Sequence, residues 1–176
     1  MIIKKLRPNQ IMTTNDFPVH NEHILKIYFK VCKEGHPEIL PPTPVMPISV
    51  GLPLMKGNTK KIKEFNQAIK KWFKENPKVK YIMIDGSHKT TALTLTHNPI
   101  NSMIIKNLKD IKEARKLEKQ GKILSVIIKP SIKAELKNKA EHYFEAEFFQ
   151  TVQSKTDRMV QAKVIPKYMI DFYKKT

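Results

Sequence analysis

A short apolar run that ends at an acidic residue and a glycine constrains the fold of this chain most strongly. Residues 81–84 are all hydrophobic, Pro77 precedes them, and Asp85 and Gly86 follow directly. A continuous apolar run of this length is typical of a buried central strand. The sequence therefore predicts a strand that ends at a tight turn, followed by a helix that begins near Ser87.

Strands and helices alternate along the rest of the chain. Further strands are expected at 2–6, 101–106 and 123–128, and helices at 21–33, 59–75, 107–120 and 131–150, with one or two more that are broken near Pro166. Prolines crowd the stretch 37–53, where 45–50 is expected to form an edge strand because proline lacks the ladder amide. This mixed order predicts an α/β or α+β fold, with a small mixed sheet and flanking helices.

The charge of the chain is strongly positive. Among its 176 residues, lysine and arginine number 33 and the acids 16, which gives a net charge of +17. Such a field attracts polyanions such as nucleic acid, nucleotides or an anionic membrane surface. A surface that is merely rich in lysine has the same composition. Arginine, the usual reader of base edges, occurs only at Arg7, Arg115 and Arg158, which argues against sequence-specific DNA reading.

Lysines gather on one face of the helix expected at 59–75. The set that we call the lysine ridge consists of Lys60, Lys63, Lys70, Lys71 and Lys74. A charged helix face is commonly just solvated, and the alternative is a ridge that faces DNA or RNA.

Neither a membrane span nor a disulfide is expected. No apolar run reaches the roughly 18 residues that a membrane helix needs, and the first residues do not lead into the apolar core of a signal peptide. Cys32 is the single cysteine, which excludes an internal disulfide and fits a reducing compartment. We therefore expect a cytoplasmic protein without a membrane partner.

The strand-to-helix turn is the best candidate site. Glycine allows a ligand to approach the backbone closely, and the first amides of a helix lack internal partners. The positive end of the helix dipole favours an anion there. The expected phosphate ligands are Gly86, Ser87, His88, Lys89 and Thr90. Asp85 is placed to hold magnesium or to accept a proton. The simpler interpretation is a turn in which Ser87 is only the helix N-cap.

The segment Asp85-Gly86-Ser87-His88-Lys89 resembles the Asp-Gly-x-His-Arg-type motif of the ParB/sulfiredoxin-like superfamily, which binds nucleotide phosphates. The flanking elements are similar over about residues 1–106. The resemblance implies a ParB-like nucleotide-binding domain at 1–128 with a helical C-terminal extension at 129–176 packed on it. It also implies ATP, ADP or CTP as ligand, with magnesium held through the nucleotide at Asp85, and Asp85 and His88 as catalytic residues.

The branches of this superfamily differ at matching positions. Sulfiredoxins have a catalytic cysteine where this chain has Ser87. Archaeal free-serine kinases have a glutamate near the first strand that acts as the catalytic base. This chain has Gln10 at that place, and Asp16 and Glu22 are the possible substitutes. ParB partition proteins add a helix-turn-helix, which the region after Pro130 does not resemble.

Two functions follow from these observations. The first is magnesium-dependent hydrolysis of a nucleoside triphosphate, or phosphoryl transfer from it, at the Asp-Gly-Ser-His-Lys turn, as in an NTPase or a small-molecule kinase. The alternative is a non-enzymatic module, related to ParB partition proteins, that binds DNA or RNA irrespective of sequence. The sequence leaves the oligomeric state open.

Overall fold

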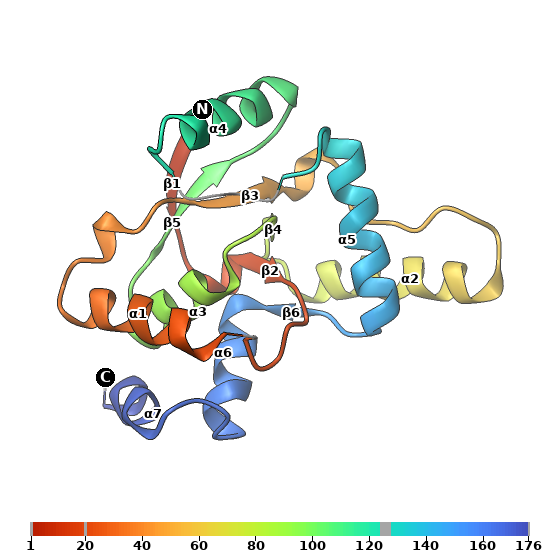
Figure 1. The fold of residues 1–176 in the computed structure, drawn as a ribbon. Helices are drawn as coiled ribbons and strands as arrows, with labels where there is room; N and C mark the ends of the chain where they lie inside the picture. Colours follow the sequence, from red (N-terminus) through yellow and green to blue (C-terminus); the bar gives the residue numbers. More distant parts are fainter. Residues whose placement is uncertain (1, 20, 124–127, 176) are drawn as a thin grey trace.

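A computed structural model describes residues 2–19, 21–123 and 128–175 of the chain (Figure 1). Within them a mixed sheet has the strand order β1-β5-β3-β4-β2-β6. Its strands are β1 (Ile2–Leu6), β2 (Ile11–Thr13), β3 (Thr43–Pro47), β4 (Tyr81–Met83), β5 (Ile100–Ile104) and β6 (Gln150–Thr151). The helices are α1 (Glu22–Lys33), α2 (Lys60–Glu75), α3 (Ser87–Leu95), α4 (Leu108–Lys119), α5 (Ile132–Ala146), α6 (Val152–Gln161) and α7 (Lys167–Lys174). The mixed α/β class that the sequence predicts is confirmed.

Polar side chains start most of these helices. The Asn21 side chain accepts a hydrogen bond from the Ile24 amide at the start of α1, and Thr59, Asn107 and Ser131 cap α2, α4 and α5 in the same way. A cap of this kind satisfies an amide that has no partner inside the helix. The predicted starts of these four helices agree with the structure for this reason.

The sheet separates two groups of helices. Met12, Met46 and Ile82 face a core shared with α2, α4 and α5, whereas the adjacent Ile11 and Val45 face α1 and α3. Side chains alternate between the two faces of a strand, so neighbouring residues on β2 and β3 enter different cores. Helices α6 and α7 pack against α1 and α3 in a third core, to which they contribute Met159 and Met169.

The proline-bearing strand corrects one prediction. β3 lies between β5 and β4 in the interior of the sheet, not at its edge, and 48–50 form a short 3-10 helix instead of a strand. Pro44 lacks an amide, but its carbonyl accepts a hydrogen bond from the Ile84 amide at 3.0 Å. An interior strand tolerates Pro44 because the neighbouring segment bonds to its carbonyl, so the missing amide is not needed there.

The last quarter of the chain contains a strand that the sequence did not predict. α5 ends at Ala146, earlier than the expected 150, and β6 then pairs antiparallel with β2. The division into units 1–128 and 129–176 stays a prediction, but β6 belongs to the same sheet as β1–β5. The strand expected at 123–128 falls largely on 124–127, outside the described residues. In the part of the chain that the structure describes, no helix is long and apolar enough to cross a membrane.

Candidate functional site

The turn after β4 has the geometry that its glycine suggests. Gly86 is the N-cap of α3 with a φ of 111°, a left-handed conformation that other residues rarely adopt. A side-chain carbon at Gly86 would lie 3.2 Å from Cγ2 of Thr43 on β3. The Gly86 amide donates a hydrogen bond to Oδ1 of Asp85 at 2.7 Å. Glycine is therefore required here both for the turn and for the close approach of β3.

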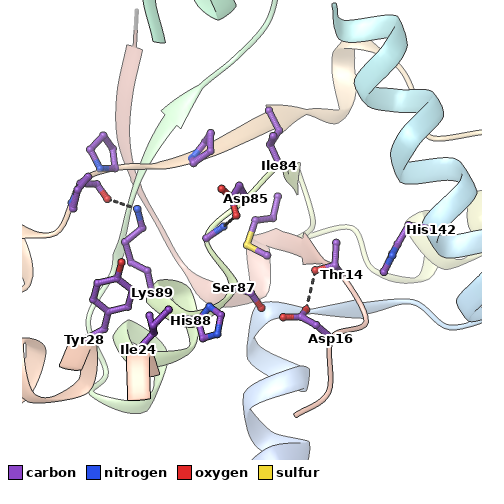
Figure 2. Close-up of a pocket in the computed structure, with 15 residues that line it drawn as sticks. Thr14, Asp16, Ile24, Tyr28, Ile84, Asp85, Ser87, His88, Lys89 and His142 are labelled. Atoms are coloured by element: carbon purple, nitrogen blue, oxygen red, sulfur yellow. Dashed lines mark hydrogen bonds between the residues drawn. The ribbon is translucent and has the colours of Figure 1, made fainter. Parts of the chain in front are cut away.

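A cavity of about 440 Å³ opens over this turn (Figure 2). The turn itself contributes Asp85 to Lys89, and the loop after β2 contributes Thr14 and Asp16. Ile24 and Tyr28 of α1 and three prolines before and within β3 form a less polar wall, and His142 of α5 lies on the other side. The volume falls within the range of roughly 300–1,000 Å³ that small-molecule sites occupy.

Ser87 and Asp16 are both bonded to the same lysine. Nζ of Lys155, on α6, lies 2.5 Å from Oγ of Ser87 and 2.6 Å from Oδ1 of Asp16. Asp16 also accepts a hydrogen bond from the Thr14 hydroxyl at 2.9 Å. Lys155 is only 1% exposed. This ion pair, whose lysine is buried and whose carboxylate borders the cavity, joins the N-terminal loop, the start of α3 and the C-terminal part of the chain at one point.

The charges of this pair modify each other. Burial alone would raise the pKa of Asp16, but the charge of the Lys155 ammonium group and the hydrogen bonds from Lys155 and Thr14 together outweigh burial and lower the pKa. Burial lowers the pKa of Lys155, and Asp16 opposes that shift. Asp16 is therefore ionised at neutral pH and accepts hydrogen bonds without donating any.

Two further lysines are buried around the turn. Nζ of Lys89 donates to the Pro41 carbonyl at 2.5 Å, and burial lowers its pKa to about 8 against the opposing effect of Asp85. Nζ of Lys139, on α5, donates to the Ile84 carbonyl at 2.7 Å, and burial lowers its pKa as well. Buried ionisable groups with shifted pKa values gather at functional sites more often than elsewhere.

Two histidines fix the loop that carries Asp16. Nε2 of His142 accepts a hydrogen bond from the Asn15 amide at 2.9 Å, and Nε2 of His88 accepts one from the Asn21 amide at 3.1 Å. A backbone amide only donates, so each ring accepts through an unprotonated Nε2. Burial lowers the pKa of His142, and the nearby Lys139 ammonium lowers it further. The structure thus places His88 in the pocket wall, with one nitrogen engaged in holding the loop.

Two predictions about the turn are corrected. Thr90 is 1% exposed and its hydroxyl donates to the carbonyls of Gly86 and Ser87, so it supplies no donor to the cavity. Ser87 is the first residue of α3 and not its N-cap, because Gly86 occupies that position and no side chain caps the helix. Asp85, Gly86, Ser87, His88 and Lys89 do line the cavity together, as the sequence predicts.

Of the two acids proposed as substitutes for a base at Gln10, only one lies at the site. Asp16 lines the cavity, whereas Glu22 forms an exposed ion pair with Lys26 at 2.5 Å. Sequence reasoning missed Lys139, His142 and Lys155 altogether. No local pattern marks them, since each reaches the turn from a distant helix.

The donor set suits magnesium only in part. Within the described residues, no group of three or more His, Cys, Asp or Glu side chains is arranged to hold a metal ion. Magnesium usually takes one or two carboxylates together with substrate phosphates. Asp85 at the turn fits that requirement if a nucleotide supplies the other oxygens.

The lysine ridge lies outside the cavity. All five of its lysines are exposed on α2, with Lys60 facing Glu64 at 3.8 Å and Lys71 facing Glu75 at 3.7 Å. A second, more apolar groove of about 930 Å³ lies between residues 50–56 and α5. It is larger than the cavity over the turn, but it lacks a comparable cluster of buried ionisable groups, so the smaller cavity is the better candidate.

Comparisons with known proteins leave the family open. No family model matches the chain, and neither a curated protein nor a solved structure matches it. The likeness of the turn to the ParB/sulfiredoxin-like superfamily therefore stays a prediction that depends on the motif and its flanking elements.

Proposed function

We propose that the chain binds a nucleotide with magnesium at the turn after β4 and hydrolyses or transfers its terminal phosphate. One observation carries this proposal: a cavity of ligand size is centred on the N-terminus of α3, with the carboxylates of Asp85 and Asp16 on its wall. The helix N-terminus favours an anion, and carboxylates serve phosphoryl transfer by holding magnesium and by orienting the attacking hydroxyl or water.

The two sides of the cavity suit the two parts of a nucleotide. Tyr28 and Ile24, with the neighbouring prolines, offer an apolar wall for a base, and an aromatic ring stacks on any base. The amides at the start of α3 and the Ser87 hydroxyl suit the phosphates. Lys89 stands in the wall as well, although its ammonium group is bonded to Pro41. The resemblance of the motif to nucleotide-binding relatives points in the same direction.

A thermal-shift panel tests this proposal. ATP, ADP, CTP and GTP are each added with and without magnesium, and a ligand that binds only the native state raises the melting temperature. We expect a shift for at least one nucleotide, and Asp85→Asn should remove the part that depends on magnesium.

Asp110→Asn is the matched control for Asp85→Asn. Its carboxylate also accepts a backbone amide, that of Lys106 at 2.8 Å, but at the surface on α4. Asp110→Asn should leave the shift intact. A panel in which no nucleotide changes the melting temperature would rule out nucleotide binding.

A second function is favoured by the lysine ridge. Within the described residues Lys63, Lys70 and Lys74 are exposed and form no ion pair. Unpaired lysines on one helix face suit the phosphates of DNA or RNA, and such binding ignores sequence and weakens steeply with salt. Binding of a random duplex that does not change with salt concentration would contradict this function.

A further inference from the structure

The Ser87 hydroxyl lies at an ammonium group that is itself paired with a carboxylate. An ammonium group only donates, so Oγ of Ser87 accepts the hydrogen bond from Lys155 at 2.5 Å. The same Nζ of Lys155 lies 2.6 Å from Oδ1 of Asp16, so the Ser87 hydroxyl and the Asp16 carboxylate meet at one ammonium group. Figure 2 shows the Ser87 side chain directed toward Asp16.

A capping role does not account for this arrangement. Elsewhere in the chain Ser131 accepts the amide of Ala134 at 3.2 Å, as an N-cap serine does. Ser87 makes no such bond, since it stands one position inside the helix after Gly86. It lines the cavity, and behind it lies an ion pair whose lysine is 1% exposed. A hydroxyl that is fixed by a buried ammonium group beside a carboxylate, and that is open to a cavity, has the arrangement of an oriented nucleophile.

We propose that Ser87 is a phosphoryl acceptor and becomes phosphoserine when a nucleoside triphosphate and magnesium occupy the cavity. This inference rests on the proposed nucleotide binding. Oγ of Ser87 forms a bond to the terminal phosphorus, and the bond from that phosphorus to the bridging oxygen breaks. The electron pair leaves with the nucleoside diphosphate, and the hydroxyl proton moves to the Asp16 carboxylate.

Asp16 and Lys155 have separate roles in this step. Phosphoryl transfer demands positioning and charge neutralisation more than a strong base, so an ionised carboxylate suffices to orient the hydroxyl. Lys155 keeps its ammonium group at Oγ while the new bond forms, and it neutralises Asp16 until the proton arrives. Nζ of Lys155 contacts both the reacting hydroxyl group and the Asp16 carboxylate.

The start of α3 also favours the product. A phosphate at the first position of a helix interacts with the positive end of the dipole and with amides that lack helical partners. Lys155 gives it an adjacent cation. Lys155 also offsets the repulsion between the new phosphate and the Asp16 carboxylate after the proton has passed on to solvent. Phosphoserine at Ser87 should therefore persist long enough to be isolated.

Intact mass spectrometry with peptide mapping tests this proposal. The full chain is incubated with ATP, CTP or GTP and magnesium, and one added phosphoryl group is expected on the peptide that contains Ser87. Ser87→Ala should abolish the label. Asp16→Asn should slow labelling by roughly 10²–10⁴-fold, the usual contribution of a positioned base. Ser49→Ala, an exposed serine on the 3-10 helix after β3, is the matched control and should be labelled like the wild-type protein.

The thermal-shift panel run on the same samples separates the two proposals. A nucleotide-dependent shift without phosphoserine, or a label that survives in Ser87→Ala, overturns the acceptor role and leaves nucleotide binding intact. Absence of both the shift and the label overturns the two proposals together. Ser87→Thr keeps the hydroxyl, so partial recovery of the label in this variant supports the role of that group over a purely structural effect.

Discussion

Lysine occurs in two opposite environments in this molecule: it is buried around the turn after β4, in the set that we call the pocket lysines, and it is exposed on the lysine ridge. Lys89, Lys139 and Lys155 are 8%, 5% and 1% exposed, and each directs its ammonium group at a named oxygen close to the turn. The ridge lysines on α2 are exposed, and where they meet an acid the distance is 3.7–3.8 Å. The amino-acid composition does not distinguish these two groups of lysines.

The difference shows that burial decides what a lysine does. A buried ammonium group loses its hydration, and this loss costs free energy unless carbonyl or carboxylate oxygens bond to the group. Removing one of these partners therefore destabilises the folded protein. An exposed pair contributes roughly 0–1 kcal/mol and is screened by salt. The pocket lysines should therefore control folding and the chemistry of the turn, while the ridge lysines should control only association with other molecules.

The largest effect is expected for Lys155→Met. The substitution leaves Asp16 without its cation at a position that is largely buried, and breaking a buried pair costs about 3–5 kcal/mol of unfolding free energy. The matched ridge variant, Lys70→Met, should change that free energy by less than about 0.5 kcal/mol. Urea denaturation of both variants measures the contrast. Equal losses would show that the two classes of lysine do not differ.

A double variant sharpens this result. Asp16→Asn in the Lys155→Met background removes the uncompensated carboxylate, so the double variant should lose less stability than the sum of the two single variants. Strict additivity would indicate that the contact between Asp16 and Lys155 carries no coupling.

The pH dependence of stability gives the next effect. Burial lowers the pKa of Lys89 from 10.5 to about 8. Between these values the native lysine has lost its proton and the unfolded one has kept it, so the unfolded state binds more protons and stability rises with pH. Relative to Lys89→Met, the wild-type protein should gain up to about 3 kcal/mol across this window. The measurement is urea denaturation of both proteins at several pH values, and a constant difference would contradict it.

The smallest effect on stability is expected at the ridge. Replacing Lys63, Lys70 and Lys74 together by Gln should change the unfolding free energy by less than about 0.5 kcal/mol per site. If the ridge contacts a nucleic-acid backbone, the same variant should lower the slope of log affinity against log salt by about three, one for each lysine. Fluorescence anisotropy with a random duplex measures that slope. An unchanged slope would mean that these lysines are only solvated.

The sequence predicted what depends on neighbouring residues. The strand at 81–83, its turn and the capped starts of α1, α2, α4 and α5 follow from apolar runs and from single polar residues next to them. These signals are local, so a sequence shows them directly. The place of Gly86, Ser87 and His88 in one cavity followed from the same turn.

The sequence could not predict what depends on pairing across the fold. β2 and β6 have only three and two residues, too few for a recognisable alternation, and they are defined by each other and by β4. The interior position of β3 depends on which of its backbone amides and carbonyls form hydrogen bonds with the neighbouring strands. Lys155 reaches Asp16 across 139 residues, a separation over which no pattern in the sequence indicates a contact.

The distance along the chain between Asp16 and Lys155 also sets the order in which the protein can be completed. At a synthesis rate of roughly 5–20 residues per second, the 139 residues that separate them correspond to about 7–28 seconds on the ribosome. Ser87 is made about halfway through that interval, 68 residues before Lys155, and until Lys155 follows, the ammonium group that connects Ser87 with Asp16 is missing. If Ser87 is the phosphoryl acceptor that we propose, its phosphorylation would begin only in chains in which α6 has docked and β6 has joined the edge of the sheet.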